Sequence, residues 1–155
     1  MIHKDLELFC ATLKPEHRLL GLDVGAKTVG IAISDAARIV ASPLSTLERV
    51  RADLDIEAVR RIAESEAVGG VIIGLPVSMD GTEGRQCQRV RGFGDRLRPR
   101  VRVPVLYWDE RLSTAAVQRV LIDEADMSRR RRGKIVDKMA ASYILQGVLD
   151  ALARP

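Results

Sequence analysis

Two apolar runs separated by a short polar turn dominate the first third of the chain. They predict strands at 18–24 and 28–34, and the Gly25–Lys27 turn between them is short enough to make the pair an antiparallel hairpin. A third strand is expected at 38–46. It contains Pro43, which cannot donate a backbone hydrogen bond inside a sheet, so we place it at the sheet edge.

The middle of the chain alternates helical and strand patterns. Apolar residues recur at helical spacing after Asp53, whose side chain is placed to cap the helix, and Gly69–Gly70 is expected to end it. The continuous apolar run 71–75 is typical of a parallel strand covered on both faces. A further helix over 86–97 and a strand at 103–108 follow.

Two helices are expected near the C-terminus. One starts at Ser113 and the other near Ile135, and the Arg-rich segment between them lacks apolar periodicity, which predicts a loop. The whole order, three strands followed by alternating helices and strands, predicts an α/β fold with a mixed sheet flanked by helices. We expect residues 1–16 to be an N-terminal extension and residues 17–155 to be a single domain.

Three acids adjoin apolar segments. Asp23 lies inside a strand pattern, where an uncompensated carboxylate is costly to desolvate. Glu110 follows the fifth predicted strand, and Asp137 is in phase with the apolar stripe of the last helix, so it should face the sheet. Carboxylates gathered on a hydrophobic sheet are typical of metal-dependent phosphotransfer. The alternatives are a strand-end Asp23 satisfied by backbone N–H groups and an Asp137 favoured in a first helical turn by the helix dipole.

Charge and composition narrow the function classes. The chain has 25 Lys and Arg against 21 Asp and Glu, and its densest basic run comprises Arg129, Arg130, Arg131, Arg132 and Lys134. Such a cluster suits a polyanion such as nucleic acid, and its alternative is a solvated charge run. Aromatic residues make up only 3%, which disfavours base stacking. The N-terminus lacks an apolar leader and no apolar stretch approaches about 20 residues, so we expect a cytoplasmic protein without a membrane partner.

Four motif blocks, in order, connect the chain with a known family. The segment 21–27 followed by 30–35 resembles the opening motif of the YqgF family, which comprises ribonuclease-H-like Holliday-junction resolvases and pre-16S ribosomal RNA nucleases. Three further blocks match: 74–76 with 79–84, 109–114, and 137–141 with 144–146. The resemblance covers about 18–152, and four blocks at natural spacing are far more specific than any one alone.

The resemblance implies a ribonuclease-H-like three-layer fold with a five-stranded mixed sheet flanked by helices. It also implies an acidic triad, which falls on Asp23, Glu110 and Asp137 and would bind Mg²⁺ or Mn²⁺. The chain departs from the wider superfamily at one point. Related resolvases carry an acid on the strand where this chain has Gly74-Leu75-Pro76, so Glu110 would supply that acid from the next strand.

The leading hypothesis is a metal-dependent nuclease that hydrolyses phosphodiester bonds in structured nucleic acid, in maturation of the pre-16S ribosomal RNA 5′ end. Its partners would be precursor ribosomal RNA or branched DNA, with ribosomal particles as a further candidate, and the protein would be a monomer or a homodimer. Lys27, Arg111 and the basic run 129–134 would contact phosphates. For Arg111 the alternative is a structural ion pair.

Three other hypotheses remain open. A Holliday-junction resolvase acting on DNA would use the same acids. The Asp-Val-Gly strand also resembles the first phosphate loop of actin-like ATPases and sugar kinases, but their site lies between two such domains and this chain has length for one. A non-catalytic nucleic-acid-binding ribosome-assembly factor would gain nothing from buried carboxylates that repel phosphate.

Overall fold

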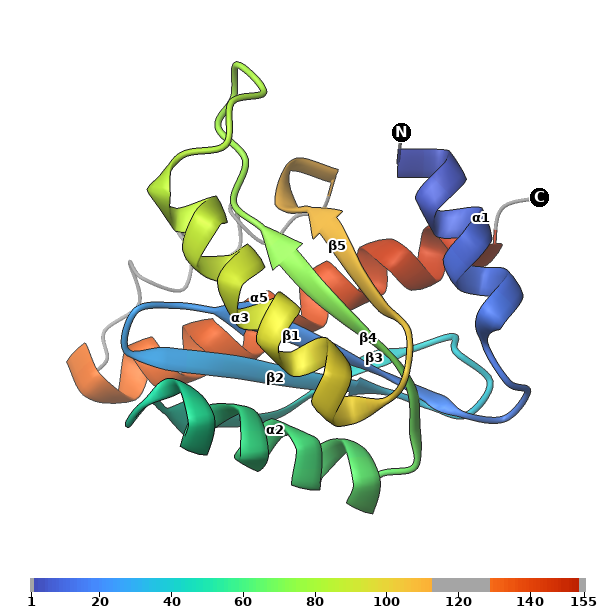
Figure 1. The fold of residues 1–155 in the computed structure, drawn as a ribbon, viewed down its shortest axis with the longest axis horizontal. Coiled ribbons are helices and arrows are strands. Elements are labelled where there is room, and N and C mark those ends of the chain that lie inside the picture. Colours follow the sequence, from blue (N-terminus) through green and yellow to red (C-terminus); the bar gives the residue numbers. More distant parts are fainter. Residues whose placement is uncertain (1, 113–128, 154–155) are drawn as a thin grey trace.

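A five-stranded mixed sheet forms the centre of the computed structural model, which describes residues 2–112 and 129–153 (Figure 1). The strand order is β3-β2-β1-β4-β5. The first three strands form an antiparallel meander, whereas β4 runs parallel to β1 and β5 runs parallel to β4. Their bounds are β1 Arg18–Val24, β2 Thr28–Ser34, β3 Ala41–Glu48, β4 Val68–Leu75 and β5 Val105–Asp109.

Helices cover both faces of the sheet and give the three layers of a ribonuclease-H-like fold, as predicted. Helices α2 and α3 pack on one face, and α5 packs across β1, β2 and β3 on the other (Figure 1). The helices are α1 Ile2–Thr12, α2 Ala52–Ser65, α3 Arg85–Val101, the short 3₁₀ helix η1 Glu110–Leu112, and α5 Arg129–Ala153. None of the described helices combines the length and apolar composition that a bilayer-spanning segment needs.

The central strands have nearly continuous apolar sequences because helices cover both of their faces. In β1, Leu20 and Leu22 belong to the core under α2 and α3, whereas Leu19 belongs to the core under α5, and all three are fully buried. Side chains of successive strand residues point to opposite faces, so one strand contributes to both cores. An edge strand has one side without a partner strand, so it tolerates a proline that lacks a backbone N–H. Pro43 lies in the edge strand β3, as predicted.

Helix α1 extends the layer that contains α5. Its Leu6 and Phe9 are buried in the same core as α5, and the Phe9 ring packs where Gly70 of β4 has no side chain. The predicted N-terminal extension therefore covers one end of the sheet rather than projecting from it.

Two predictions about α2 were wrong. The helix begins at Ala52 with Arg51 at its N-cap, and Asp53 instead lies in the first turn, where it pairs with Arg51. At the other end, Gly69 and Gly70 belong to β4, and the positive φ of 52° that a glycine would accommodate falls on Ala67. Local glycine and cap signals were outweighed by the pairing of β4 with β1.

The prediction that the basic run 129–134 forms a loop was also wrong. Residues 129–134 form the first turns of α5, which begins at Arg129 and not near Ile135. Apolar periodicity did not predict these helical turns because they extend past the end of the sheet, where a helix needs no apolar stripe (Figure 1). Arginine is a good helix former, which is sufficient to continue a helix held further along. The helix expected from Ser113 lies outside the described residues.

Glycines let α5 lie directly on the sheet. A Cβ at Gly21 would lie 2.8 Å from the Cβ of Leu145, and a Cβ at Gly30 would overlap the backbone carbonyl of Asp137. The helix thus contacts the strands at main-chain distance at these two points. Gln146 adds a tie at the sheet edge, where its side chain accepts from the Ala41 N–H at 2.8 Å and donates to the Ile39 carbonyl at 2.9 Å.

Substituting Gly30 by Ala should destabilise the protein because the added methyl group overlaps helix backbone that cannot rotate away. Overpacking of this kind costs about 1–3 kcal/mol or more. Gly92→Ala is the matched control, since an added Cβ there meets nothing within 4 Å and should stabilise α3 by up to about 1 kcal/mol. Urea unfolding measures both, and equal stabilities for the two variants would contradict the close packing of α5.

Candidate functional site

Asp23 faces α5 from the middle of the sheet. It lies directly opposite Gly30 in the antiparallel pair of β1 and β2, and directly opposed residues present their side chains on the same face. The Gly30 face is the one covered by the backbone of Asp137. The half-buried Asp23 carboxylate therefore lies beside the point where α5 crosses β2.

Glu110 reaches the same face from the other side of Asp23. Gly74 follows Ile73, the residue paired with Leu22, so it lies next to Asp23 across β1 and β4. A Cβ at Gly74 would lie 3.1 Å from Cγ and 3.2 Å from Oε1 of Glu110. The Glu110 side chain, together with Ile144 Cδ1 at 2.6 Å from the same Cβ position, thus occupies the space that a side chain on β4 would otherwise fill.

Gly30, Asp23 and Gly74 form one row across β2, β1 and β4, which we call the glycine-flanked row. Neighbouring strands lie about 4.8 Å apart, so each glycine is about that far from Asp23 along the row. One flank is covered by the α5 backbone at Asp137 and the other by the Glu110 side chain. Three acids that are far apart in the sequence are therefore carried by elements that approach the same face of the sheet beside β1.

Asp137 faces the sheet, as its phase with the apolar stripe predicted. Its Oδ2 accepts a short hydrogen bond from the hydroxyl of Thr28, the first residue of β2. Because α5 begins at Arg129, Asp137 is not a first-turn acid, which removes the helix-dipole alternative. The apolar residues of the same stripe, Ala141, Ile144 and Val148, are fully buried.

The three carboxylates supply the hard oxygen donors that Mg²⁺ and Mn²⁺ prefer. Across residues 2–112 and 129–153, however, no three His, Cys, Asp or Glu side chains are grouped closely enough to hold a metal ion. The donor chemistry and the shared face fit a divalent cation, whereas the side-chain conformations do not bring the three acids together around one.

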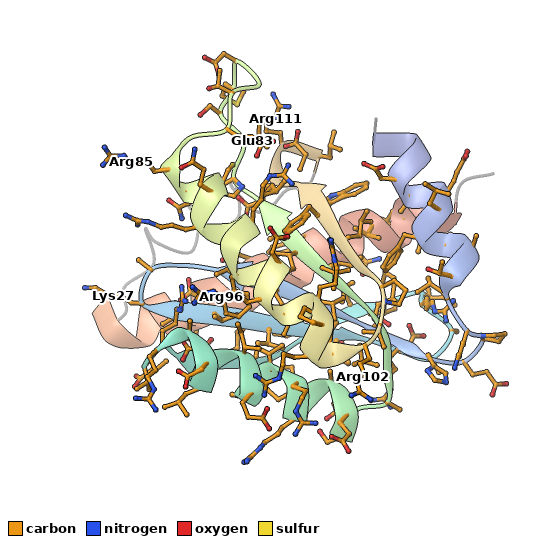
Figure 2. All side chains as sticks on the ribbon, viewed as in Figure 1. Lys27, Glu83, Arg85, Arg96, Arg102 and Arg111 are labelled. Carbon is orange, nitrogen blue, oxygen red and sulfur yellow. The ribbon has the colours of Figure 1, made fainter. Side chains whose placement is uncertain are left out.

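An ion pair between half-buried Arg49 and buried Asp55 holds the turn that follows Asp23. The Arg49 guanidinium donates to the Gly25 carbonyl at 3.0 Å, and the Arg49 N–H donates to the Lys27 carbonyl at 2.9 Å. Asp55, only 2% exposed, accepts from Arg49 Nε at 3.1 Å and from the Val50 N–H at 2.9 Å. Lys27 is thereby presented on a fixed, exposed turn at the end of β1 (Figure 2).

The sequence analysis missed Asp55 and Arg49. A signal was available for Asp55, because it is in helical phase with Val59 and Ile62, the same kind of signal that singled out Asp137. Arg49 carried no comparable pattern. Its role depends on the position of the β1–β2 turn relative to α2, which only the tertiary structure defines.

Arg111 is held in a structural ion pair. Its guanidinium donates to Asp109 Oδ2 at 2.6 Å, and it also reaches the carbonyls of Ser78 and Met79 in the loop after β4 (Figure 2). The Arg111 side chain, followed by its backbone N–H, holds the pKa of Asp109 below its usual range. This arrangement favours the structural alternative for Arg111 over a free phosphate contact.

Comparison with known proteins identifies the family. The family model described as RuvX, Holliday junction resolvase, matches residues 17–151. The chain belongs to this family. A relative from Paramagnetospirillum magneticum is 52% identical over 140 residues, covering 90% of each chain, and one from Caulobacter vibrioides is 50% identical over 149 residues, covering 96% of each. Both are named "Putative pre-16S rRNA nuclease".

Solved structures share the fold of this RuvX-family chain at low sequence identity. Thermus thermophilus RuvC in complex with a Holliday junction substrate has a TM-score of 0.57 at 12% identity, covering 88% of this chain and 96% of that one. The yeast mitochondrial resolvase Ydc2 has a TM-score of 0.53 at 16% identity, covering 96% and 82%. These likenesses confirm the ribonuclease-H-like fold.

The basic run lies at the same end of this RuvX-family fold as Lys27. Arg129, Arg130, Arg131, Arg132 and Lys134 belong to the turns of α5 that extend past the sheet, close to the end where the β1–β2 turn lies (Figures 1 and 2). Their side chains are outside the described part of the structure. The backbone alone therefore places them about one to two turns of α5 before Asp137.

Replacing Arg111 by Gln should destabilise the protein at neutral pH, because Asp109 keeps a carboxylate that is nearly buried and loses its partner. We expect a modest loss of stability, because Arg111 itself is partly exposed and its charge is screened by solvent. A carboxyl with a lowered folded pKa stabilises above its unfolded value of about 3.9, and that contribution is lost as the pH falls through the folded pKa.

Urea unfolding at pH 7 and pH 3 measures this effect. The difference between wild type and Arg111→Gln should shrink at the lower pH, and the double variant Asp109→Asn/Arg111→Gln should regain stability at pH 7. A difference independent of pH would show that Arg111 acts through packing and not through its charge.

Proposed function

We propose that this protein is a divalent-metal-dependent nuclease that hydrolyses phosphodiester bonds in precursor 16S ribosomal RNA during maturation of its 5′ end. The observation that carries the proposal is the glycine-flanked row, which surrounds Asp23 with Glu110 and Asp137 on one face of the sheet. Relatives about 50% identical carry the name of a pre-16S rRNA nuclease, which supports the choice of substrate and ribosomal particles as partners.

Asp23, Glu110 and Asp137 would hold Mg²⁺ or Mn²⁺. When bound, such an ion would supply Lewis-acid stabilisation and a more acidic water for attack on phosphorus. The described conformations do not group the three carboxylates, so the proposal requires their side chains to turn towards one another. Thr28 orients Asp137 from the sheet side through its hydroxyl, which leaves the other carboxylate oxygen of Asp137 for the ion.

The chain's own cations would position the substrate. Lys27 stands on a turn that Arg49 holds by two of its backbone carbonyls, so its charge is presented at a defined place beside the acids. The basic run 129–134 would contact further phosphates at the same end of the fold as Lys27. Contacts of this type bind the backbone without reading bases, so selectivity should follow the shape of the nucleic acid.

A second candidate function is resolution of branched DNA, the activity in the description of the family model. It would use the same acids and the same basic surface. A non-catalytic assembly factor is the third, and it predicts that the acids are dispensable. Activity on both RNA and DNA substrates separates the three.

Asp23→Asn should abolish cleavage, with little loss of stability, because it removes the central donor and preserves the shape of the side chain. Asp53→Asn is the matched control, since Asp53 is a surface acid whose side chain is 66% exposed. Both variants and the wild type are incubated with a labelled pre-16S 5′ segment and with a four-way DNA junction, in Mn²⁺, Mg²⁺ or EDTA. Near wild-type cleavage by Asp23→Asn, or in EDTA, would refute the metal-dependent mechanism.

Replacing Arg129, Arg130, Arg131 and Arg132 by Gln should weaken binding of all nucleic acids and flatten its salt dependence. Each lost contact with duplex phosphate removes about 0.9 from the slope of log affinity against log salt. Gln is also a good helix former, so α5 should persist. The quadruple Lys variant keeps the charge and should keep the slope, and an unchanged slope in the Gln variant would show a solvated run without a substrate role.

A further inference from the structure

An arginine-lined groove lies between α2 and α3, on the face of the sheet opposite α5. Its volume is about 520 Å³, and we call it the α2–α3 groove. The residues that matter here are Ala26, Arg49, Arg51, Arg89, Gly92 and Arg96. The three triad residues are not part of its lining, and α5 lies on the opposite face of the sheet, so the groove is a separate surface feature.

Two exposed arginines of α3 have no intramolecular partner among the residues that the structure describes. Arg89 and Arg96 are exposed, and neither forms an ion pair with any residue that the structure describes. On the same helix, Arg91 pairs with Glu83 at 2.6 Å and Arg100 pairs with Glu57 at 2.6 Å. Arg89 and Arg96 thus add uncompensated positive charge to the groove, whereas Arg91 and Arg100 are neutralised by acids.

Spacing along α3 gives these charges a linear arrangement. Arg89 and Arg96 are seven residues apart, which is two turns on one side of a helix and about 10.5 Å along its axis. Arg85, four residues before Arg89, continues the same stripe and is also exposed. A single nucleic-acid strand in a duplex carries one charge per about 3.4 Å of axis, so the stripe spans several phosphates.

The acids beside the groove do not cancel this charge. Asp55 lines it, but its carboxylate is 2% exposed and accepts from Arg49 and from the Val50 N–H. Asp53 pairs with Arg51 at the rim. Arg89 and Arg96 remain available to a ligand.

Gly92 lies between the two arginines and has no structural explanation within the described residues. A Cβ added there would meet nothing within 4 Å, whereas a Cβ at Gly94 would collide with the Tyr107 ring. Glycine inside a helix weakens it, and open space above the glycine lets another backbone approach closely. The surface over Gly92, within the groove, is thus open to a ligand.

The groove begins at the turn next to the candidate active site. Ala26, which lines it, precedes Lys27 and comes three residues after Asp23. Figure 2 shows Lys27 and Arg96 on the same side of the molecule, where this turn meets α2 and α3. A strand that contacts Lys27 can therefore continue into the groove around the end of β1.

We propose that the α2–α3 groove binds the sugar-phosphate backbone of the nucleic-acid substrate several nucleotides away from the bond that is cleaved. The proposal rests on the proposed function for the identity of the ligand. It assigns Arg89 and Arg96 as phosphate contacts, and Arg49 as the residue that joins the groove wall to the β1–β2 turn.

Fluorescence anisotropy on the Asp23→Asn protein in EDTA tests binding without cleavage. The probe is a labelled RNA hairpin with a single-stranded 5′ extension. Arg89→Gln/Arg96→Gln should lower the slope of log affinity against log salt by about 1.4–1.8, from about 0.7 to 0.9 per contact. The control Lys14→Gln/Arg61→Gln removes the same charge from exposed positions outside the groove and should leave the slope within error.

Gly92→Gln supplies an independent variant that changes no charge. It should raise the melting temperature, because Gln favours a helix more than Gly, and weaken binding by obstructing the groove. Equal slopes for both double variants, together with unchanged binding by Gly92→Gln, would overturn the groove proposal. Binding is measured without catalysis, so the two proposals can fail separately. A lower salt slope for Arg89→Gln/Arg96→Gln would support the groove even if the wild-type protein cleaved neither RNA nor DNA, a result that would refute the nuclease.

Discussion

The contact of α5 with the main chain of β1 and β2 is the constraint on which the rest of the site depends. Gly21 and Gly30 have no side chains to hold the helix away, so Leu145 and the Asp137 backbone lie directly on the strands. The distance of a helix from a sheet is normally set by side chains between them. Here the close approach brings a helical carboxylate to the level of a strand carboxylate and allows Thr28 to orient it.

The same principle applies at Gly74, where a missing side chain on β4 gives room to Glu110. Gly74 leaves a space beside Asp23, and the side chain from the end of β5 enters it. A carboxylate group is thus delivered to the same region from a neighbouring strand end. Glu110 reaches this region because β4 and β5 run parallel and end at the same edge, with Leu75 paired with Asp109.

Charge is distributed so that paired and unpaired arginines have different roles. Arg49 and Arg111 are held by Asp55 and Asp109, and each fixes backbone near the acids. An ion pair with one nearly buried partner is a poor source of net stability, yet it specifies where a loop must lie. Arg89 and Arg96 have no such partner among the described residues and remain on the surface, where only a ligand would compensate them.

The sequence by itself determined the strand hairpin, the buried parallel strand, the edge position of β3 and the inward orientation of Asp137. Each of these follows from periodicity or from the chemistry of one residue, such as Pro43. The predicted N-cap at Asp53 and the predicted helix start near Ile135 were wrong, because local caps and apolar periods compete weakly with sheet pairing and with helix continuation. Only the tertiary structure decided the roles of Gly30 and Gly74, because the sequence does not show which atoms occupy the space beside a glycine.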